Sequence, residues 1–526
     1  MKNGFRQSMA WLHTWSGLLV GWILFAVFAT GTATYFRNEI SQYMRPELQA
    51  SEQSLERTAQ LTFATLQRIG AGSPTWFIGM PDERDPGVTV FYRRQGSTQR
   101  RFDFATLDPA TGEPVEARGT RGGEFFYRFH FELHMQPLWG RWIVSFCAMM
   151  MLVAIISGII THRRIFADFF TFRPGKAAGR SWLDAHNAFA VLALPYHLMI
   201  TYTGLITLML MTMPWGAQVV YKGDTRAFFN EAIGAMPAPR PARQAAPLAD
   251  PGPMVAAALR EWGSIGRITV NLPGDAHALV QVSRGDGDRL SANPQTMVFN
   301  GVTGAHISTT PMESAAAATR GVTYGLHQGR FARPVMRALF FLSGLAGCAM
   351  VATGLVLWAA KIRQKQTARK RRTFGLWLVD SLNVGAVAGL PFAMAAFFHA
   401  NRLLPLHIED RQEWEVKVFF AAWVLTLVHA MFRRIGRAWI EVFALAAIAA
   451  LALPLVNFAT TGRHLGVSLL RGDVVMAGMD LGFVFLGLLF AAIARKLWLR
   501  DKAPAPVRKS RVPRPAASAP AEVEPA

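Results

Sequence analysis

The sequence predicts a mainly α membrane protein with eight transmembrane helices and two small α+β units outside the bilayer. Three observations predict this fold class. Hydrophobic residues make up 51% of the 526 residues, and the mean hydropathy is +0.21. The hydrophobic residues gather in runs of roughly 20, the length that a helix needs to cross a bilayer. Basic residues cluster in alternate short segments between these runs. This composition excludes a soluble enzyme, a disordered chain and a fibrous repeat.

Eight apolar runs are long enough to span the membrane as helices. They lie near 11–35, 139–161, 183–213, 334–360, 375–399, 414–432, 438–459 and 474–496. The first run follows Lys2 and Arg6, as the apolar part of a secretory signal would. It is long for a signal and carries three tryptophans, so we expect it to remain as a transmembrane helix.

These runs divide the chain into ordered segments. The predicted segments are a first helix (1–35), a first outside unit (36–133), a second helix (134–161), a loop (162–182), a third helix (183–213), a second outside unit (214–326), a fourth helix (327–360), a basic loop (361–374), four additional helices (375–500) and a tail (501–526). The tail is rich in Pro and Ala, and we expect it to be disordered.

The basic residues predict the orientation of the chain. Segment 162–180 holds five basic residues and one acid, and segment 361–372 holds seven basic residues and no acid. Further basic clusters follow the sixth and eighth runs. All four clusters fall on one side if the helices alternate, and that side is predicted to be cytoplasmic, with both termini inside. The formal charge of +21 therefore indicates topology rather than nucleic-acid binding.

Each long outside segment has the pattern of a small α+β unit. The first is expected to contain a helix at 51–70, strands at 88–93 and 101–107, and a turn at 108–112. The second is expected to contain a helix at 253–263 and strands at 267–271 and 278–283.

A repeat of helix, outside unit and helix occurs twice before residue 361, and local sequences agree between the copies. His13 lies 17 residues before Thr30-Gly31, and His186 lies 17 residues before Thr203-Gly204. On the returning helices, His134 precedes Ser157-Gly158 and His327 precedes Thr353-Gly354. Corresponding helices run in the same direction, which predicts a pseudo-two-fold axis along the membrane normal.

Such an axis places corresponding histidines at equal depths. It pairs His13 with His186 near the cytoplasmic face, and His134 with His327 near the outer face. Two imidazoles that face one another across a four-helix bundle are typical ligands of a haem iron. The sequence therefore predicts a four-helix haem-binding core with two haem b groups, whose irons are ligated by His13, His186, His134 and His327.

Other residues near these positions have alternative interpretations. His197 lies eleven residues after His186 within the third run and could replace His134 or His327 as an outer ligand, or form a hydrogen bond across the bundle. His162 is a candidate ligand, a haem-propionate partner or a basic loop residue. Arg141 and Arg330 are placed to meet propionates, although snorkelling or topology control is the favoured explanation for arginines at helix ends.

Two further patterns carry weaker signals. The recurrent glycines in the Ser/Thr-Gly pairs would let a macrocycle or a neighbouring helix approach closely. His130 and His134 form a His-x-x-x-His pattern, but Glu132 is not placed as the zinc proteases of this pattern require.

Taken together, these stretches resemble the PepSY-associated transmembrane family of bacterial inner-membrane proteins. The matching stretches begin at Trp11, Leu133, Gly140, Thr161, Asp168, Trp182, Leu194 and Leu326, and they span about 1–360. The resemblance implies two PepSY-like periplasmic units, a four-helix core and a link to iron uptake, with haem-dependent reduction of ferric siderophores in some members. The chain differs from many relatives by its four additional helices.

The leading functional hypothesis is an inner-membrane diheme reductase. Electrons from an unidentified cytoplasmic or quinol donor would pass through both haems to a periplasmic ferric siderophore or similar ferric chelate. One alternative is a non-enzymatic membrane module or transporter subunit whose periplasmic units bind a peptide or protein. Another is a quinol-linked b-type cytochrome that serves a protein partner.

Overall fold

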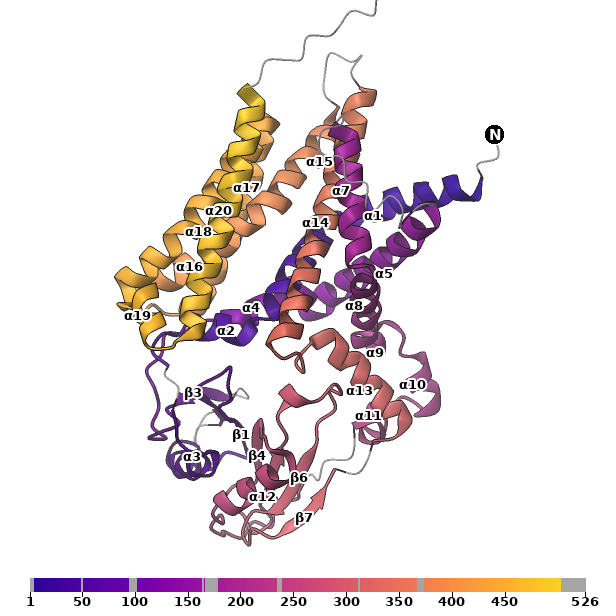
Figure 1. The fold of residues 1–526 in the computed structure, drawn as a ribbon. Coiled ribbons are helices and arrows are strands. Elements are labelled where there is room, and N and C mark those ends of the chain that lie inside the picture. The colour runs from indigo at the N-terminus through magenta and orange to yellow at the C-terminus, as the bar shows by residue number, and fades with distance from the viewer. Residues whose placement is uncertain are drawn as a thin grey trace, which may run out of the picture.

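The structure is a computed structural model that describes residues 4–48, 51–93, 102–162, 165, 178–233, 239–310, 313–366 and 373–502. Most of the predicted loop 162–182, part of the basic loop 361–374 and nearly all of the predicted tail 501–526 lie outside the described residues. Helices make up most of the described chain, and one sheet lies at one end of the molecule (Figure 1).

Seven helical stretches of the described chain are long and apolar enough to cross a membrane, which makes the protein a multi-pass membrane protein. They are α1 (Phe5–Thr34), α5 (Pro137–Thr161), α14 (Pro334–Lys365), the joined elements α15 (Phe374–Val384), η2 (Gly385–Gly389) and α16 (Leu390–Leu403), then α17 (Arg411–Phe432), α18 (Ile435–Thr461) and α20 (Val474–Lys502).

The third predicted span is broken rather than straight. Its two parts, α7 (Ala178–Leu192) and α8 (Leu194–Thr207), meet at an angle of 67°. Pro195 lies in the first turn of α8, where it removes a backbone donor and prevents the α7 hydrogen-bond ladder from continuing. The expectation of one helix over 183–213 was wrong in this respect. Counted as one bent span, the pair raises the number of spans to eight.

The two outside segments share one antiparallel sheet of seven strands in the order β3-β2-β1-β4-β5-β6-β7. The strands are β1 (Thr75–Gly79), β2 (Val88–Tyr92), β3 (Asp103–Leu107), β4 (Arg267–Asn271), β5 (Leu279–Ser283), β6 (Thr296–Asn300) and β7 (His306–Thr309). Strands β1 and β4 pair along their whole length, from Thr75 opposite Asn271 to Gly79 opposite Arg267. The two predicted units are therefore not separate, because β1 of the first unit pairs with β4 of the second along the strand edge that each would otherwise expose.

One face of the sheet is covered by α3 (Leu55–Ile69) and α12 (Gly252–Trp262). Alternate strand residues such as Ile78, Val90 and Ile268 are fully buried beneath these helices. The predicted positions of both helices and of β2 to β5 are confirmed to within a few residues. Strands β1, β6 and β7 were not predicted.

The first four spans form a bundle in which α1 packs against α5 and α14, α14 against α7, and α5 against α8. Two short helices connect the sheet to this bundle. They are α4 (Gly122–Glu132), which packs on α1, and α13 (Ala315–Gln328), which packs on α8. The remaining short elements are α2 (Arg37–Tyr43), α9 (Met209–Thr212), α10 (Trp215–Val220), α11 (Thr225–Ile233), η1 (Asp286–Asp288) and α19 (Leu465–Leu470).

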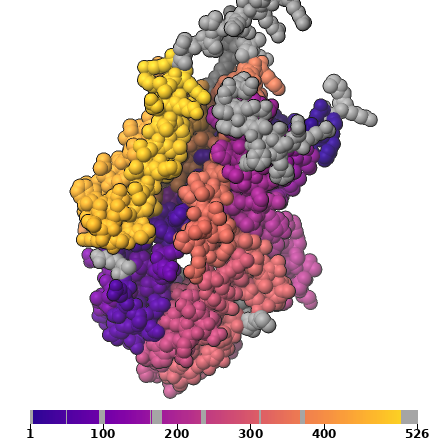
Figure 2. Space-filling view, viewed as in Figure 1, coloured from indigo at the N-terminus to yellow at the C-terminus, as the bar shows by residue number. Residues whose placement is uncertain are grey.

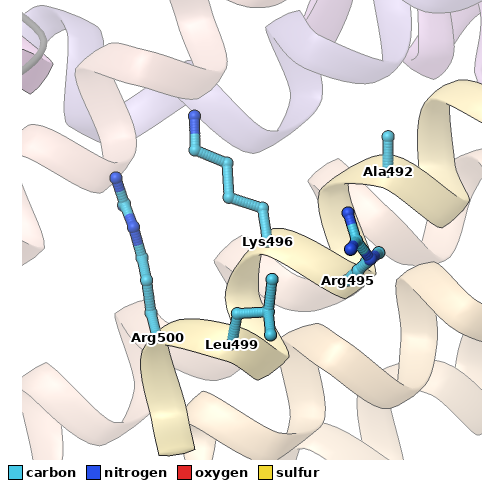
Figure 3. Close-up of a pocket in the computed structure, with 5 residues that line it drawn as sticks. All are labelled: Ala492, Arg495, Lys496, Leu499 and Arg500. Atoms are coloured by element: carbon cyan, nitrogen blue, oxygen red, sulfur yellow. The ribbon is translucent and has the colours of Figure 1, made fainter. Parts of the chain in front are cut away.

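The last four spans pack beside this bundle (Figures 1 and 2). The free end of α20 lies at the opposite end of the molecule from the sheet (Figure 1). At that end a pocket is lined by Ala492, Arg495, Lys496, Leu499 and Arg500, and Figure 3 shows Lys496 and Arg500 extending from the helix.

Candidate cofactor site: two facing pairs of histidines

The first pair is formed by His13 on α1 and His186 on α7. Their ring centroids are 6.1 Å apart and their planes are inclined by 61°. The Nδ1 atom of His13 lies 2.8 Å from the carbonyl oxygen of Ala154, and that of His186 lies 2.9 Å from the carbonyl oxygen of Met350. Because a carbonyl only accepts, each Nδ1 is the donor, and each Nε2 keeps a lone pair for a metal ion.

The second pair is formed by His130 on α4 and His327 on α13. Their ring centroids are 6.0 Å apart and their planes are inclined by 30°. The Nδ1 atoms lie 2.8 Å from the carbonyl oxygen of Val27 and 3.1 Å from that of Ile200, respectively. Burial lowers the pKa of His327 to about 3 and also lowers the pKa of His130. Both rings are therefore neutral at pH 7.

The four carbonyl acceptors share one local sequence. Each is followed three residues later by Ser or Thr and four residues later by Gly. The stretches run from Val27 to Gly31, Ala154 to Gly158, Ile200 to Gly204 and Met350 to Gly354. In each stretch the hydroxyl also lies within hydrogen-bond distance of the same carbonyl.

The glycine of each stretch makes room for the imidazole. A Cβ atom added to Gly31 would lie 2.6 Å from Nδ1 of His130, and one added to Gly204 would lie 2.9 Å from Cε1 of His327. The rings of His13 and His186 lie against Gly158 and Gly354 in the same way. These glycines therefore accommodate histidine rings directly.

The spacing of each pair equals that of two imidazoles bound to opposite sides of one metal ion. Metal–imidazole bonds of about 2 Å on each side of one ion place the ring centroids about 6 Å apart. Within the described residues, no group of three or more His, Cys, Asp or Glu side chains is placed to hold a metal ion. Two imidazoles alone suit an iron whose other ligands come from a planar macrocycle, as in a haem.

His134 does not face His327, so the predicted outer pairing is corrected to His130 with His327. Helix α4 ends at Glu132, and both Leu133 and His134 adopt left-handed backbone conformations with φ of 52°. The turn directs His134 away from α1 and toward the last four helices, where its ring lies 5.6 Å from that of Phe420. His130 stays on the face of α4 that packs on α1.

The spacing to the following Ser/Thr-Gly pair favours His130, whereas the shared dipeptides Leu133-His134 and Leu326-His327 favoured His134. The interval from His130 to Gly158 is 28 residues, and the interval from His327 to Gly354 is 27. The interval from His134 to Gly158 is only 24. Counting back from the Ser/Thr-Gly pair would have selected the histidine one helical turn earlier.

His197 is fully buried in α8 and lies close to the level of the second pair. It precedes Ile200 by three residues, and its ring centroid lies 6.1 Å from that of Phe28, the neighbour of Val27. Neither ring nitrogen forms a hydrogen bond of good geometry among the described residues, although backbone carbonyls of Ala190 and Ser343 lie near the ring. It therefore lacks the short, well-aligned carbonyl hydrogen bond that orients the four paired histidines.

The remaining candidates lie around the bundle rather than between the pairs. His162 lies 3.4 Å from the side-chain amide of Asn187, next to His186. Arg141 forms an ion pair of 2.6 Å with Glu132, and Arg330 pairs with Asp286 beside the sheet. Both arginines thus already have carboxylate partners within the protein.

Comparison with known proteins agrees with the resemblance of the sequence motifs. The model of a family described as the PepSY-associated TM region matches residues 10–361. The matched stretch holds both histidine pairs and the whole sheet, and it ends before α15. The chain is also 26% identical over 398 residues to an uncharacterized protein of Pseudomonas aeruginosa, covering 71% of this chain and 94% of that relative.

Proposed function

The chain belongs to the PepSY-associated TM region family, and on that premise we propose that it is a diheme reductase of the bacterial inner membrane. It passes electrons across the membrane to a ferric chelate, such as a ferric siderophore, on the outer side. The observation that carries this proposal is the presence of two facing imidazole pairs, each with Nδ1 held by a carbonyl and a centroid distance of 6.1 or 6.0 Å.

A haem b at each pair would supply reversible one-electron chemistry. His13 and His186 would hold one group, and His130 and His327 the other. The carbonyls of Ala154, Met350, Val27 and Ile200 fix the ring orientations and increase the basicity of each Nε2.

The side chains of α1 between the two pairs keep water out of the path. Val20, Leu24 and Phe25 are all at least nine-tenths buried. His13 and Gly31, which receives His130, are 18 residues apart on this helix, or about 27 Å along its axis. The two pairs are therefore far apart along α1, which supports an electron path across much of the bilayer.

The reaction is the reduction of one Fe(III) to Fe(II) by each electron that crosses. A chelator that binds Fe(III) much more tightly than Fe(II) then releases the metal without being broken down. The electrons come from a quinol or a cytoplasmic reductant. The basic residues at the end of α20 and the basic segment 361–372 support a cytoplasmic location for both termini, which leaves the sheet outside.

The test is haem counting combined with electron-transfer kinetics on the purified full-length protein. We expect two haems per chain, and one haem in each of the variants His13→Ala and His327→Ala. In stopped-flow experiments the reduced wild type should be reoxidised by a ferric chelate. A colourless protein from haem-replete cells would overturn the proposal in favour of a non-enzymatic module. Two haems that ignore ferric chelates and react only with a protein partner would favour a quinol-linked cytochrome.

A further inference from the structure

Three phenylalanines form a row on the face of the sheet opposite α3 and α12. Phe77 on β1 pairs with Phe91 on β2, which pairs with Phe104 on β3. The rings of Phe91 and Phe104 are 5.2 Å apart, and Phe102 lies 5.5 Å from Phe77. Phe91 and Phe104 are 42% and 48% exposed, although aromatic side chains of this size usually bury most of their surface.

The fold itself does not require aromatic residues at these positions. The corresponding row in the second half of the sheet is Thr269 on β4, Gln281 on β5 and Val298 on β6. Thr269 is the direct cross-strand partner of Phe77. Gln281 and Val298 are buried, 3% and 4% exposed. The two halves thus share a backbone pattern, but only the first presents exposed aromatic rings.

Two guanidinium groups border the phenylalanine row. Arg45 lies over the Phe104 ring at 5.8 Å, and Arg93 lies over the Phe102 ring at 5.6 Å. Neither forms an ion pair with a residue that the structure describes, but Arg45 donates to the carbonyl oxygen of Thr120 at 3.3 Å, and Asp85, Glu415 and Glu47 act on it electrostatically. The Nε atom of Arg93 is buried without a hydrogen-bond partner among the described residues. The row therefore offers π surfaces beside two guanidinium groups.

The row faces the end of the bundle that carries the second histidine pair. Arg45 lies two residues after the end of α2, which packs on α4, the helix of His130. Arg84, in the connection between β1 and β2, donates to the carbonyl of Tyr35 at the end of α1 and pairs with Glu39 on α2. A molecule held on the row would therefore sit between the sheet and the outer end of the electron path.

We propose that Phe77, Phe91 and Phe104, together with Arg45 and Arg93, bind an anionic aromatic ferric chelate, of the catecholate or phenolate class. This inference rests on the proposed reductase function and specifies its substrate. Aromatic rings of the chelator stack on the phenylalanines, and its negative charge attracts the two arginines. An aliphatic hydroxamate chelate has neither the rings nor a comparable negative charge, and it is bound more weakly.

The experiment measures binding of gallium(III) chelates to the full-length protein in lipid nanodiscs, because gallium(III) replaces ferric ion without being reduced. The variants are Phe91→Leu with Phe104→Leu, which keeps apolar side chains but removes the rings, and Arg93→Gln. Arg260→Gln is the control, since this exposed residue lies on α12 at the covered side of the sheet. We expect about a tenfold loss of affinity for a tris-catecholate in the double variant and a several-fold loss in Arg93→Gln. Hydroxamate binding and the control should be unchanged.

Two readouts separate this inference from the proposed function. Haem content and reoxidation by ferricyanide should be normal in the double variant if the electron path is intact. Equal losses for catecholate and hydroxamate, or unchanged catecholate binding, would overturn the inference even with both haems present. If the double variant lost binding to vesicles of anionic phospholipid but kept its chelate binding, the row would be a membrane-contact surface. That result would also overturn the inference.

Discussion

Each paired histidine is held by a five-residue stretch of another helix, which runs from the carbonyl residue to the Gly. A helix carbonyl accepts from Nδ1, the Ser or Thr one turn later shares that carbonyl, and the following Gly leaves space for the ring. This five-residue stretch occurs four times, once for each paired histidine. Because the Gly has no Cβ, a single methyl group at this position should disturb one histidine without altering the rest of the bundle.

Gly31→Ala tests whether the Gly of this stretch is needed to leave space for the imidazole. The new Cβ would lie 2.6 Å from Nδ1 of His130, so the ring must move and lose its contact with the Val27 carbonyl. We expect destabilisation of about 1–3 kcal/mol and reduced occupancy of the second haem site. The measurements are the haem-to-protein ratio and the thermal unfolding midpoint. Gly17→Ala on the same helix is the control, because no atom lies within 4 Å of the added Cβ.

His130→Ala and His134→Ala distinguish the corrected pairing from the one expected from the sequence. Removing His130 should abolish the second haem, because His327 is left as the only imidazole of that pair. Removing His134 should leave both haems, because its ring contacts Phe125 and Phe420 instead. The measurement is the number of haems per chain from the pyridine haemochrome spectrum. Loss of a haem in His134→Ala alone would restore the original pairing.

At the scale of elements, the join between β1 and β4 unites the two halves of the sheet. Two short units of three or four strands would each expose an unpaired edge, and the join removes both edges. It also gives the helices α3 and α12 one continuous core.

Ile268→Ala tests the importance of this join. Ile268 on β4 is fully buried opposite Ile78 on β1, so the truncation leaves a cavity at the centre of the sheet. We expect a loss of about 2–5 kcal/mol in the stability of the sheet. Faster hydrogen–deuterium exchange in both β1 and β4 would report it. Arg267→Ala changes an exposed neighbour and should alter stability by about 0.5 kcal/mol or less.

At the scale of the whole molecule, a buried polar cluster joins the family-matched part to the last four helices. Glu415 on α17 is fully buried and accepts from Thr120 at 2.6 Å, from Asn401 at 2.8 Å and from Arg411 at 2.7 Å. Thr120 belongs to the segment that leads into α4. Because α4 carries His130, the last four helices help to position the second histidine pair.

Glu415→Ala should therefore destabilise the whole assembly. Removing the carboxylate leaves the Arg411 guanidinium buried without its partner, at a cost of about 3–5 kcal/mol. Thermal unfolding in detergent, followed by tryptophan fluorescence, measures this loss. Glu413→Ala is the matched control. Its ion pair with Arg121 is about one-third exposed, so the change should be about 1 kcal/mol or less. Equal effects of the two substitutions would contradict a joining role for Glu415.

The sequence by itself determined the features that depend on local composition. Run length predicted the membrane spans, short strand-like runs beside turn signals predicted β2 to β5, and the repeat predicted that His13 and His186 would meet. Each of these signals lies within one helix or strand, or in a spacing that both copies share.

The tertiary structure decided which surfaces meet. The choice of His130 over His134 depends on two left-handed residues at the end of α4, and the single sheet depends on β1 meeting β4. The contact of Thr120 with Glu415, 295 residues away, likewise depends on segments that are distant in the chain. The free energy of these contacts is gained from packing between segments far apart in the chain, and the length or alternation of an apolar run does not specify which other segment its buried face will contact.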